Sequence, residues 1–231
     1  MGSRDMLVIE RAKISQLPEF LEFMYNNYDK DENMLRSMIA NNPVTFEEKE
    51  QMRLDHERLL RAIFKDLLCL IATDRTSGKM IGILLMIHNK NPRFYDDVRD
   101  VVEENPPKTK LMTDYYDYLS GIFKMANLFE KFPEAKVALE FYAVAVDKNY
   151  RGRGIASALM AEGVAFAKKV DDAGLVFGIC TSRYTKRAMD KCGFRTQYEV
   201  DLLQYKDSEG TPIFQGTEPH NIVSVDVMKL E

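Results

Sequence analysis

The chain has 231 residues, of which 45% are hydrophobic and 29% are charged, the balance of an ordinary globular protein. Its net charge of -4 disfavours general nucleic-acid binding, and the lack of an apolar run of about 20 residues disfavours a membrane span. Three widely spaced cysteines suit reduced thiols, not a disulfide framework or a zinc site. We expect one cytoplasmic domain over residues 1–231, monomeric or homodimeric, without a metal, with residues 1–5 as a flexible or cloning-derived tail.

Hydrophobic periodicity in the first half of the chain predicts a strand, three helices and a hairpin. In order, the strand covers 6–12, the helices cover 16–27, 34–40 and 45–65, and the hairpin strands cover 67–73 and 79–88. A polar break at 29–33 separates the first two helices. Thr45 followed by Glu48 is a capping box, which marks the start of the third helix. We expect His56, in this polar helix, to be solvated.

The second half begins with a polar, proline-containing stretch and continues with alternating helices and strands. In order, we expect an irregular segment at 91–110, a helix at 113–129, a strand at 137–146, a helix at 155–169, a strand at 175–180, a helix at 181–192 and strands at 195–205 and 223–229. The nearly apolar strand 137–146 is typical of a central strand buried on both faces. The strand 223–229 alternates apolar and polar residues, which predicts a sheet edge.

The most informative motif is the segment Arg151-Gly152-Arg153-Gly154-Ile155-Ala156, between the strand 137–146 and a helix. Glycines allow the backbone to approach a ligand closely. The first N–H groups of a helix lack internal partners, and the helix dipole favours negative charge there. Residues 152–157 therefore suit a pyrophosphate. Judged alone, the loop fits a turn with two solvated arginines equally well, and it is neither a P-loop nor a Rossmann fingerprint.

This segment resembles the Gln/Arg-x-x-Gly-x-Gly/Ala motif of the GNAT superfamily, because Arg151, Gly154 and Ala156 occupy its defined places. The resemblance implies an α/β (α+β) GNAT fold, with a mixed sheet of about seven strands and a splayed pair of strands that holds acetyl-CoA, the co-substrate. It implies that the cofactor contacts Val144, Ala145, Val146, Arg151, Gly152, Arg153, Gly154, Ile155, Ala156 and Ser157. One N–H of residues 144–146 is then expected to stabilise the oxyanion.

The segment 180–194 extends the resemblance but departs from the usual pattern. Gly193-Phe194 match the family, and Ser182 stands at its usual asparagine place, where it is expected to bind the cofactor. Met189 occupies the place where many members have a tyrosine that protonates the CoA thiolate. The usual general acid is therefore absent from this position.

Insect-type arylalkylamine N-acetyltransferases are similar to this chain in that same variation. Their two functional serines match Thr181 and Thr185, which retain the hydroxyl. The resemblance makes Thr181, Thr185 and Tyr184 the candidates to protonate the thiolate. The alternative is that Thr181 or Ser182 caps the helix and that Thr185 faces solvent.

An acidic segment after the first helix resembles a catalytic motif of that same group. Glu32 matches the catalytic glutamate, with Asn33 in place of a proline, and Asp31 is its neighbour. A carboxylate can take the proton of an ammonium substrate and attract it into the cleft. We expect Glu32 to be the base, and Asp31 and His220 to contact the substrate. The alternative is a solvated acidic loop, with His220 in loop packing.

Together these features predict an acetyl-CoA-dependent N-acetyltransferase that acts on a small primary amine, most plausibly an arylalkylamine, by direct attack in a ternary complex. A polyamine, an amino acid or a protein amine is the alternative acceptor. A non-catalytic acyl-CoA-binding regulator is the alternative from another class.

Overall fold

Seven strands form one sheet in the order β1-β2-β3-β4-β5-β7-β6. The computed structural model describes residues 7–230, so the expected tail at 1–5 and the first residue of the expected 6–12 strand lie outside the described residues. The strands are β1 (Leu7–Arg11), β2 (Cys69–Asp74), β3 (Met80–Lys90), β4 (Val137–Val146), β5 (Ala173–Cys180), β6 (Arg195–Asp201) and β7 (Ile222–Lys229). Only β4 and β5 pair in parallel among these strands, which confirms the mixed sheet.

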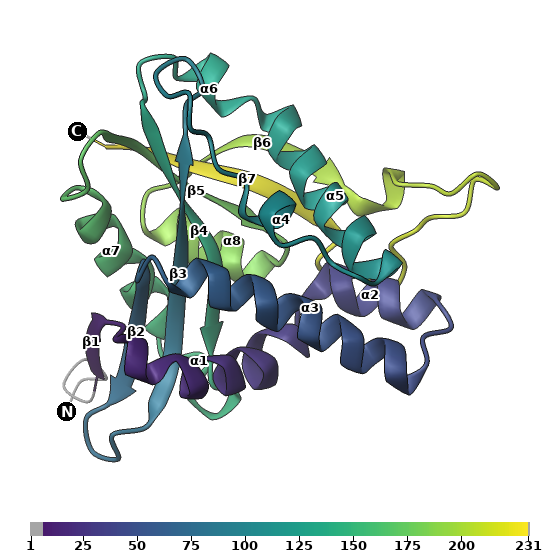
Figure 1. The fold of residues 1–231 in the computed structure, drawn as a ribbon, viewed down its shortest axis with the longest axis horizontal. Helices are drawn as coiled ribbons and strands as arrows, with labels where there is room; N and C mark the ends of the chain where they lie inside the picture. The colour runs from purple at the N-terminus through teal and green to yellow at the C-terminus, as the bar shows by residue number, and fades with distance from the viewer. Residues whose placement is uncertain (1–6, 231) are drawn as a thin grey trace.

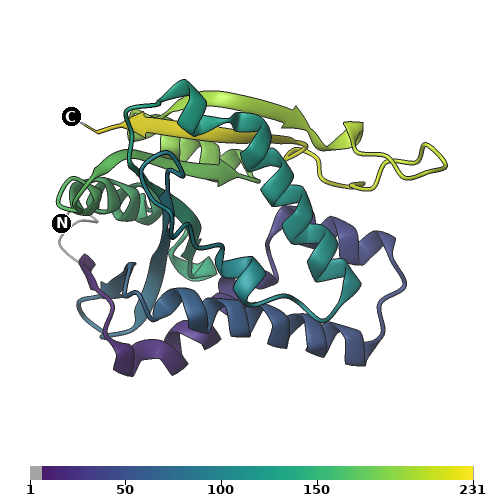
Figure 2. The ribbon, with the colours of Figure 1, turned by 45° about the horizontal axis from the view of Figure 1, so that its top comes forward.

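Helices cover both faces of the sheet and bury a core on each side (Figure 1; Figure 2). The helices are α1 (Leu17–Met24), α2 (Asn33–Asn41), α3 (Phe46–Phe64), α4 (Val101–Glu104), α5 (Lys110–Ala126), α6 (Leu128–Lys131), α7 (Ile155–Ala167) and α8 (Arg183–Lys191). The first core packs α1, α2, α3 and α5 against the sheet, and the second packs α7 and α8. Among the helices of residues 7–230, none is long and apolar enough to cross a membrane.

Capping residues decide where several helices begin. The hydroxyl of Thr45 accepts a hydrogen bond from Glu48 N at 3.1 Å, and the Glu48 carboxylate accepts one from Thr45 N at 2.8 Å. This reciprocal pair satisfies two N–H groups at the start of α3, so the predicted capping box is confirmed. Ser182 caps α8 by accepting a hydrogen bond from Thr185 N at 3.1 Å.

The first helical region differs from the prediction. The expected helix at 16–27 is a 3-10 turn (Ile14–Gln16), then α1, then a π-helix (η3, Tyr25–Asp29). Helical structure therefore runs into the expected polar break at 29–33. The reason is tertiary, since Asp29 at the end of η3 contacts His56 of α3.

The position predicted for the last strand was wrong, because β7 lies between β5 and β6 and β6 forms the edge. Polar residues on β7 suggested solvent, yet Asp226 is fully buried. Its carboxylate accepts hydrogen bonds from Thr196 Oγ1 and from Ser224 Oγ, both at 2.7 Å. A buried polar group is tolerated when its hydrogen bonds are satisfied.

Other boundaries moved by a few residues. The segment expected to be irregular, 91–110, contains the short helix α4, and α5 begins at Lys110. Asn127 takes a left-handed conformation with φ of 49°, which ends α5 before the expected residue 129. The strand expected at 195–205 ends at Asp201, whose carboxylate caps a 3-10 turn by accepting from Leu203 N.

The central strands separate halfway along their length. β4 pairs with β3 as far as Val146, but it pairs with β5 only from Val137 to Glu140. A bulge at Tyr142 shifts the register, since Leu85 pairs with Ala143 and Met86 with Phe141. Bulges bend a strand and end regular pairing. The second half of β4 therefore has an edge without a strand partner, and the expected splayed pair is present.

Candidate active site

A cleft of about 740 Å³ lies where β4 and β5 diverge. Its lining includes, from the predicted site, Asp31, Glu32, Val144, Ala145, Val146, Arg151, Gly152, Gly154, Ile155, Ala156, Ser157, Thr181, Ser182, Tyr184, Thr185 and His220. Of the predicted site residues, Arg153 alone is not part of this lining. The fold thus gathers segments from both ends of the chain around one space.

The glycine loop connects β4 to α7 with the backbone shape that glycine permits. Gly152 and Gly154 have φ of 77° and 79°, and a Cβ at either position would meet open space. The requirement for glycine at these two positions therefore comes from the backbone conformation, because other residues adopt a positive φ only at an energetic cost. The helix's first internal bond runs from Ala158 N to Gly154 O, which leaves the N–H groups of residues 155–157 to a ligand.

The two arginines of the loop point to different places. Arg151 donates from Nε to Val146 O at 3.0 Å and from Nη2 to Asp31 Oδ2 at 2.7 Å. Arg153 donates to Asn149 O and lies over the ring of Tyr150 at 5.0 Å. Arg153 lines a second, smaller hollow of about 430 Å³ together with Tyr150. The two arginines predicted to bind the cofactor therefore lie in different places, and of the two only Arg151 reaches the turn that carries Asp31.

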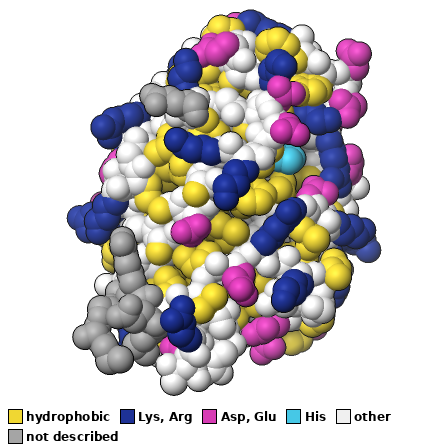
Figure 3. Space-filling view, turned by 90° about the vertical axis from the view of Figure 1, so that its left-hand side faces the viewer, with side chains coloured by type: hydrophobic (Ala, Val, Ile, Leu, Met, Phe, Trp, Pro, Cys, Tyr) yellow, Lys and Arg dark blue, Asp and Glu magenta, His cyan; other side chains and the backbone are white. Residues whose placement is uncertain are grey.

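The outer surface of α7 frames this second hollow. Figure 3 shows the side of the molecule that carries α7 in Figure 1, where apolar side chains lie between separate lysine and arginine side chains. Ala158 and Ala161 of α7 line the hollow, with Lys191 among its basic residues. Basic side chains and the start of α7 together suit a ligand that carries phosphate groups.

Glu32 lines the same cleft as the loop and is buried, so the alternative of a solvated acidic loop is wrong for this residue. It is the N-cap of α2, where Oε2 accepts a hydrogen bond from Leu35 N at 2.6 Å. Oε1 has no hydrogen-bond partner among residues 7–230. Burial raises the pKa of Glu32, while the N–H of Leu35 and the side chain of Thr181 lower it. The site thus holds a buried carboxyl oxygen without a hydrogen-bond partner in the described part of the chain.

Asp31 and His220 border the same cleft with other partners. Asp31 is half-exposed and forms the ion pair with Arg151. His220 Nδ1 accepts a hydrogen bond from Arg183 N at 3.2 Å, and its ring lies 5.1 Å from that of Tyr184. Burial and the nearby charges of Arg183 and Arg36 lower the pKa of His220. The lowered pKa favours the neutral form of this histidine, which combines loop packing with a place on the cleft wall.

The hydroxyl segment, residues 181–185, approaches Glu32 through Thr181. The Thr181 side chain lies near enough to lower the pKa of Glu32. Ser182 is the α8 cap, and its Oγ lies 3.0 Å from Thr185 Oγ1. Tyr184 is 67% exposed. Met189 is fully buried in the core beneath α8, so its side chain does not reach the cleft.

The prediction of a solvated His56 was wrong, because its side chain is only 6% exposed. His56 Nδ1 lies 2.9 Å from Asp29 Oδ1. Its ring lies 5.9 Å from the ring of Tyr28, a residue of the cleft lining. The polar surroundings of His56 in the sequence gave no sign of these long-range contacts.

The cleft-lining residues that sequence reasoning missed include Tyr150, Arg36 and Lys191. Arg36 had a signal, because it follows Glu32 by four positions and so lies about one helical turn from it. Within residues 7–230, no cluster of three His, Cys, Asp or Glu side chains is arranged to hold a metal ion.

Comparison with known proteins connects this geometry to a family. Residues 35–194 match the model of the acetyltransferase (GNAT) family. A mosquito arylalkylamine N-acetyltransferase like 5b has a TM-score of 0.80 at 21% identity, with 97% of this chain and 100% of that chain covered. Arylalkylamine N-acetyltransferase 2 from Aedes aegypti has a TM-score of 0.79 at 18% identity, with 97% and 99% covered.

A Drosophila melanogaster polyamine N-acetyltransferase that forms N-acetylagmatine has a TM-score of 0.73 at 17% identity, with 97% of this chain and 100% of that chain covered. At these identities the likeness to solved structures establishes the fold. The family match begins within α2, ends just past α8 and includes the splayed strands and the glycine loop, whereas Glu32 and His220 lie outside it. The chain therefore belongs to the GNAT acetyltransferase family and is an N-acetyltransferase.

Proposed function

We propose that this enzyme transfers the acetyl group of acetyl-CoA directly to a primary amine within a ternary complex. One observation carries the proposal: a single cleft has a glycine-rich helix start at one end, an unpaired strand edge along it, and a buried carboxyl group opposite. These are the three parts that binding a CoA thioester and deprotonating an amine require.

The residues of the loop fit the phosphates of acetyl-CoA. Gly152 and Gly154 leave open space beside the backbone, and residues 155–157 offer N–H groups at the positive end of α7. The free edge of β4 at Val144, Ala145 and Val146 offers backbone groups to the pantetheine arm. A backbone N–H of this edge would stabilise the oxyanion that forms on the thioester.

Glu32 is suited to receive the amine proton. An ammonium group cannot attack a thioester, so its proton must leave first. A raised pKa makes a carboxylate a stronger base, and Oε1 of Glu32 is free to accept. In the proposed reaction, one ammonium proton passes to Glu32 and the amine nitrogen bonds to the acetyl carbon. The nitrogen then gives up a second proton to solvent as the carbon–sulfur bond breaks and releases the CoA thiolate.

Thr181 is the residue we favour for returning a proton to the thiolate, because it faces Glu32. The hydroxyl of Thr185 lies 3.0 Å from Ser182 Oγ, and Tyr184 packs beside His220. Thr181 can pass a proton from Glu32 to sulfur while it keeps its own hydroxyl, so both groups return to their starting state.

The acceptor is proposed to be an arylalkylamine. Aromatic rings of Tyr28, Tyr184 and His220 line the cleft near Glu32 and can stack on an aromatic body. The second carboxylate, Asp31, is neutralised by Arg151, and Arg36 adds a positive charge. A substrate with one cation and an aromatic ring therefore suits this wall best.

A polyamine is the second candidate, and the Asp31–Arg151 pair supports it. Both side chains are half-exposed, so the pair is weak. If the pyrophosphate draws Arg151 away, Asp31 becomes a second anion for a second cation. An amino acid or a protein amine has no comparable feature in its favour.

CoA release from acetyl-CoA, measured with a thiol reagent, tests the proposal. The acceptors would be tyramine, dopamine, serotonin, spermidine, agmatine and lysine. Turnover highest with the aromatic amines supports the acceptor class, and turnover with spermidine or agmatine alone favours the polyamine. Absence of turnover with every amine, together with bound acetyl-CoA, would contradict a small-molecule acceptor.

The base is tested by Glu32→Gln, which keeps a cap for α2. We expect kcat to fall by about 10²–10⁴-fold, with the affinity for acetyl-CoA unchanged. Glu22→Gln, at an exposed position of α1, is the matched control. Equal turnover in the two variants would remove Glu32 from the mechanism.

A further inference from the structure

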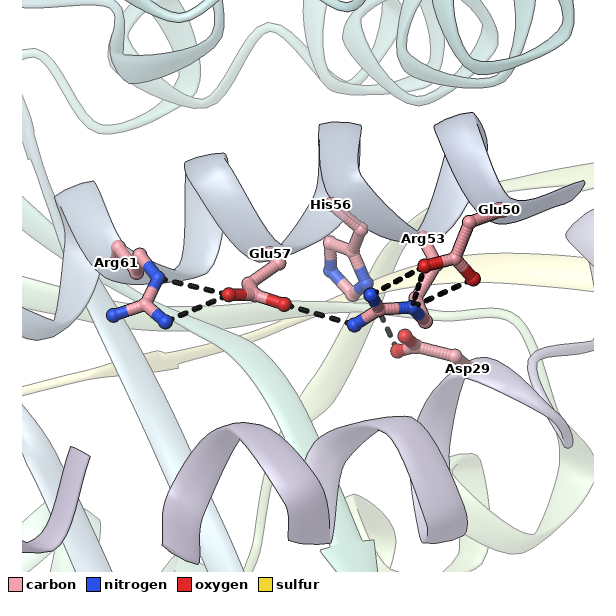
Figure 4. Close-up of polar contacts among 6 residues, drawn as sticks. All are labelled: Asp29, Glu50, Arg53, His56, Glu57 and Arg61. Carbon is pink, nitrogen blue, oxygen red and sulfur yellow. Dashed lines mark hydrogen bonds and ion pairs between the residues drawn. The ribbon is translucent and has the colours of Figure 1, made fainter. Parts of the chain in front are cut away.

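The turn that carries Glu32 is stabilised from behind by α3. Figure 4 shows His56 of α3 facing Asp29 across the space between α3 and the chain that follows α1. Beside them, Glu50, Arg53, Glu57 and Arg61 form a ladder of ion pairs along α3. The ladder is accessible to solvent, whereas the side chains of His56 and Asp29 are 6% and 14% exposed.

The π-helix η3 connects the contact between His56 and Asp29 to the turn that carries Glu32. The carbonyl of Tyr28 accepts hydrogen bonds from Asp31 N at 2.9 Å and Glu32 N at 2.8 Å. Asp29 is the next residue, so the contact with His56 acts on the same turn of backbone. π-Helical turns are uncommon and are frequent at functional sites.

α3 is a rigid support for this contact. Asp55, next to His56, has a fully buried carboxylate that accepts hydrogen bonds from Lys108 N and Thr109 N, both at 2.9 Å. On the core side, Leu59 and Ile63 of α3 are buried. His56 therefore projects from a helix that is held at both its polar and its apolar faces.

We propose that His56 is a positioning residue for the acceptor half of the site. Its ring donates to Asp29 and packs on Tyr28, which holds the turn 28–32 and so places Glu32 in the cleft. The inference rests on the proposed function of Glu32 as the base. It adds a residue behind the cleft wall to the groups that face the substrates.

The physical reason lies in the low exposure of Asp29. A carboxylate removed from water needs a hydrogen-bond donor close by. Without His56, a rotation of Asp29 toward solvent lowers the free energy of the turn. That rotation moves the Tyr28 carbonyl, and with it the N–H groups that orient Glu32. A displacement of about 1 Å at a reacting group can slow a reaction about 10²-fold.

The test compares His56→Leu with His56→Asn. Leucine fills space without a donor, and asparagine returns an N–H near the position of Nδ1. Arg61→Ala is the control, because Arg61 lies on the same helix, is 49% exposed and, among residues 7–230, pairs only with Glu57. For His56→Leu we expect faster hydrogen exchange in residues 25–33 and a kcat about 10- to 100-fold lower, with the KM for acetyl-CoA unchanged.

His56→Asn should recover most of the lost kcat, and Arg61→Ala should match the unmodified enzyme. In a Glu32→Gln background, His56→Leu should cause no further loss, since both changes remove the same function. Asp29→Asn, which weakens the contact and keeps its shape, should reproduce the direction of the effect. This variant provides the same test if His56→Leu does not fold.

Two results would overturn the positioning role. One is a kcat for His56→Leu equal to that of Arg61→Ala. The other is a loss of kcat on His56→Leu that is as large in the Glu32→Gln background as in the unmodified enzyme. Failure of the proposed function has a different signature, because Glu32→Gln would then be fully active. Hydrogen exchange reports on the contact between His56 and Asp29 independently of turnover.

Discussion

Glu140 offers a test of how burial sets the pH dependence of stability. It lies on β4, opposite Ile87 of β3 and Phe177 of β5, at the last position where β4 pairs with β5. It accepts one hydrogen bond, from Asn89 Nδ2 at 3.3 Å, and forms no ion pair within residues 7–230. The informative change is Glu140→Gln, which keeps the shape and the acceptor for Asn89 while removing the charge.

The size of the effect follows from the pKa. Burial raises the pKa of Glu140 from 4.5 to about 7. The native state therefore binds this proton more tightly than the unfolded chain does. Its stabilising contribution is fully present below pH 4.5 and is lost as the pH rises through about 7. The difference between these pKa values corresponds to on the order of 3 kcal/mol.

Urea unfolding of both proteins from pH 5 to pH 8.5 measures this contribution. Glu140→Gln should increase the free energy of unfolding by up to about 3 kcal/mol above pH 7 and by much less near pH 5. Glu199→Gln, at an exposed position of β6, is the control. A gain that is the same at every pH would show that repacking, and not charge, causes it, and would refute the reasoning.

Three further changes test other parts of the structure. Gly154→Ala should destabilise the chain by about 1–2 kcal/mol, because its φ of 79° suits glycine. Calorimetry should also show that this variant binds acetyl-CoA more weakly. An affinity equal to that of the unmodified protein would contradict the assignment of the loop to cofactor binding. Asp226→Ala should lower the free energy of unfolding by about 1–3 kcal/mol, because it leaves the hydroxyls of Thr196 and Ser224 without their acceptor, and Asp226→Asn should cost less. Thr45→Ala should cost about 1 kcal/mol through the lost cap of α3, seen as a lower melting temperature that Thr76→Ala does not share.

The departure at Met189 bears on how the site completes its chemistry. This methionine fills the core beneath α8, and its Cε lies 3.0 Å from the position that a Cβ on Gly178 would take. A tyrosine there would need space that the core does not contain. In the proposed mechanism, the return of a proton to sulfur depends on the hydroxyl segment, and Thr181→Val would probe that step.

The local features of this protein could be read from short stretches of sequence. The Thr45–Glu48 box, the glycines before α7 and the apolar run of β4 act on residues only a few positions away. Such patterns specify dihedral angles, caps and periodicity, which depend on neighbours along the chain. For this reason the boundaries of β4 were confirmed to the residue and the start of α7 was predicted correctly.

The remaining features depend on residues that are distant in sequence. The order β5-β7-β6 buries Asp226 because Thr196, 30 positions away, donates to it. His56 contacts Asp29 across 27 positions, and Arg151 contacts Asp31 across 120. A polar side chain has the same identity whether it faces water or a buried partner, so its neighbours in sequence cannot decide between the two. The sequence by itself determined most of the elements, the family motif and the candidate base, while the tertiary structure decided which polar groups meet and how the turn that carries Glu32 is held.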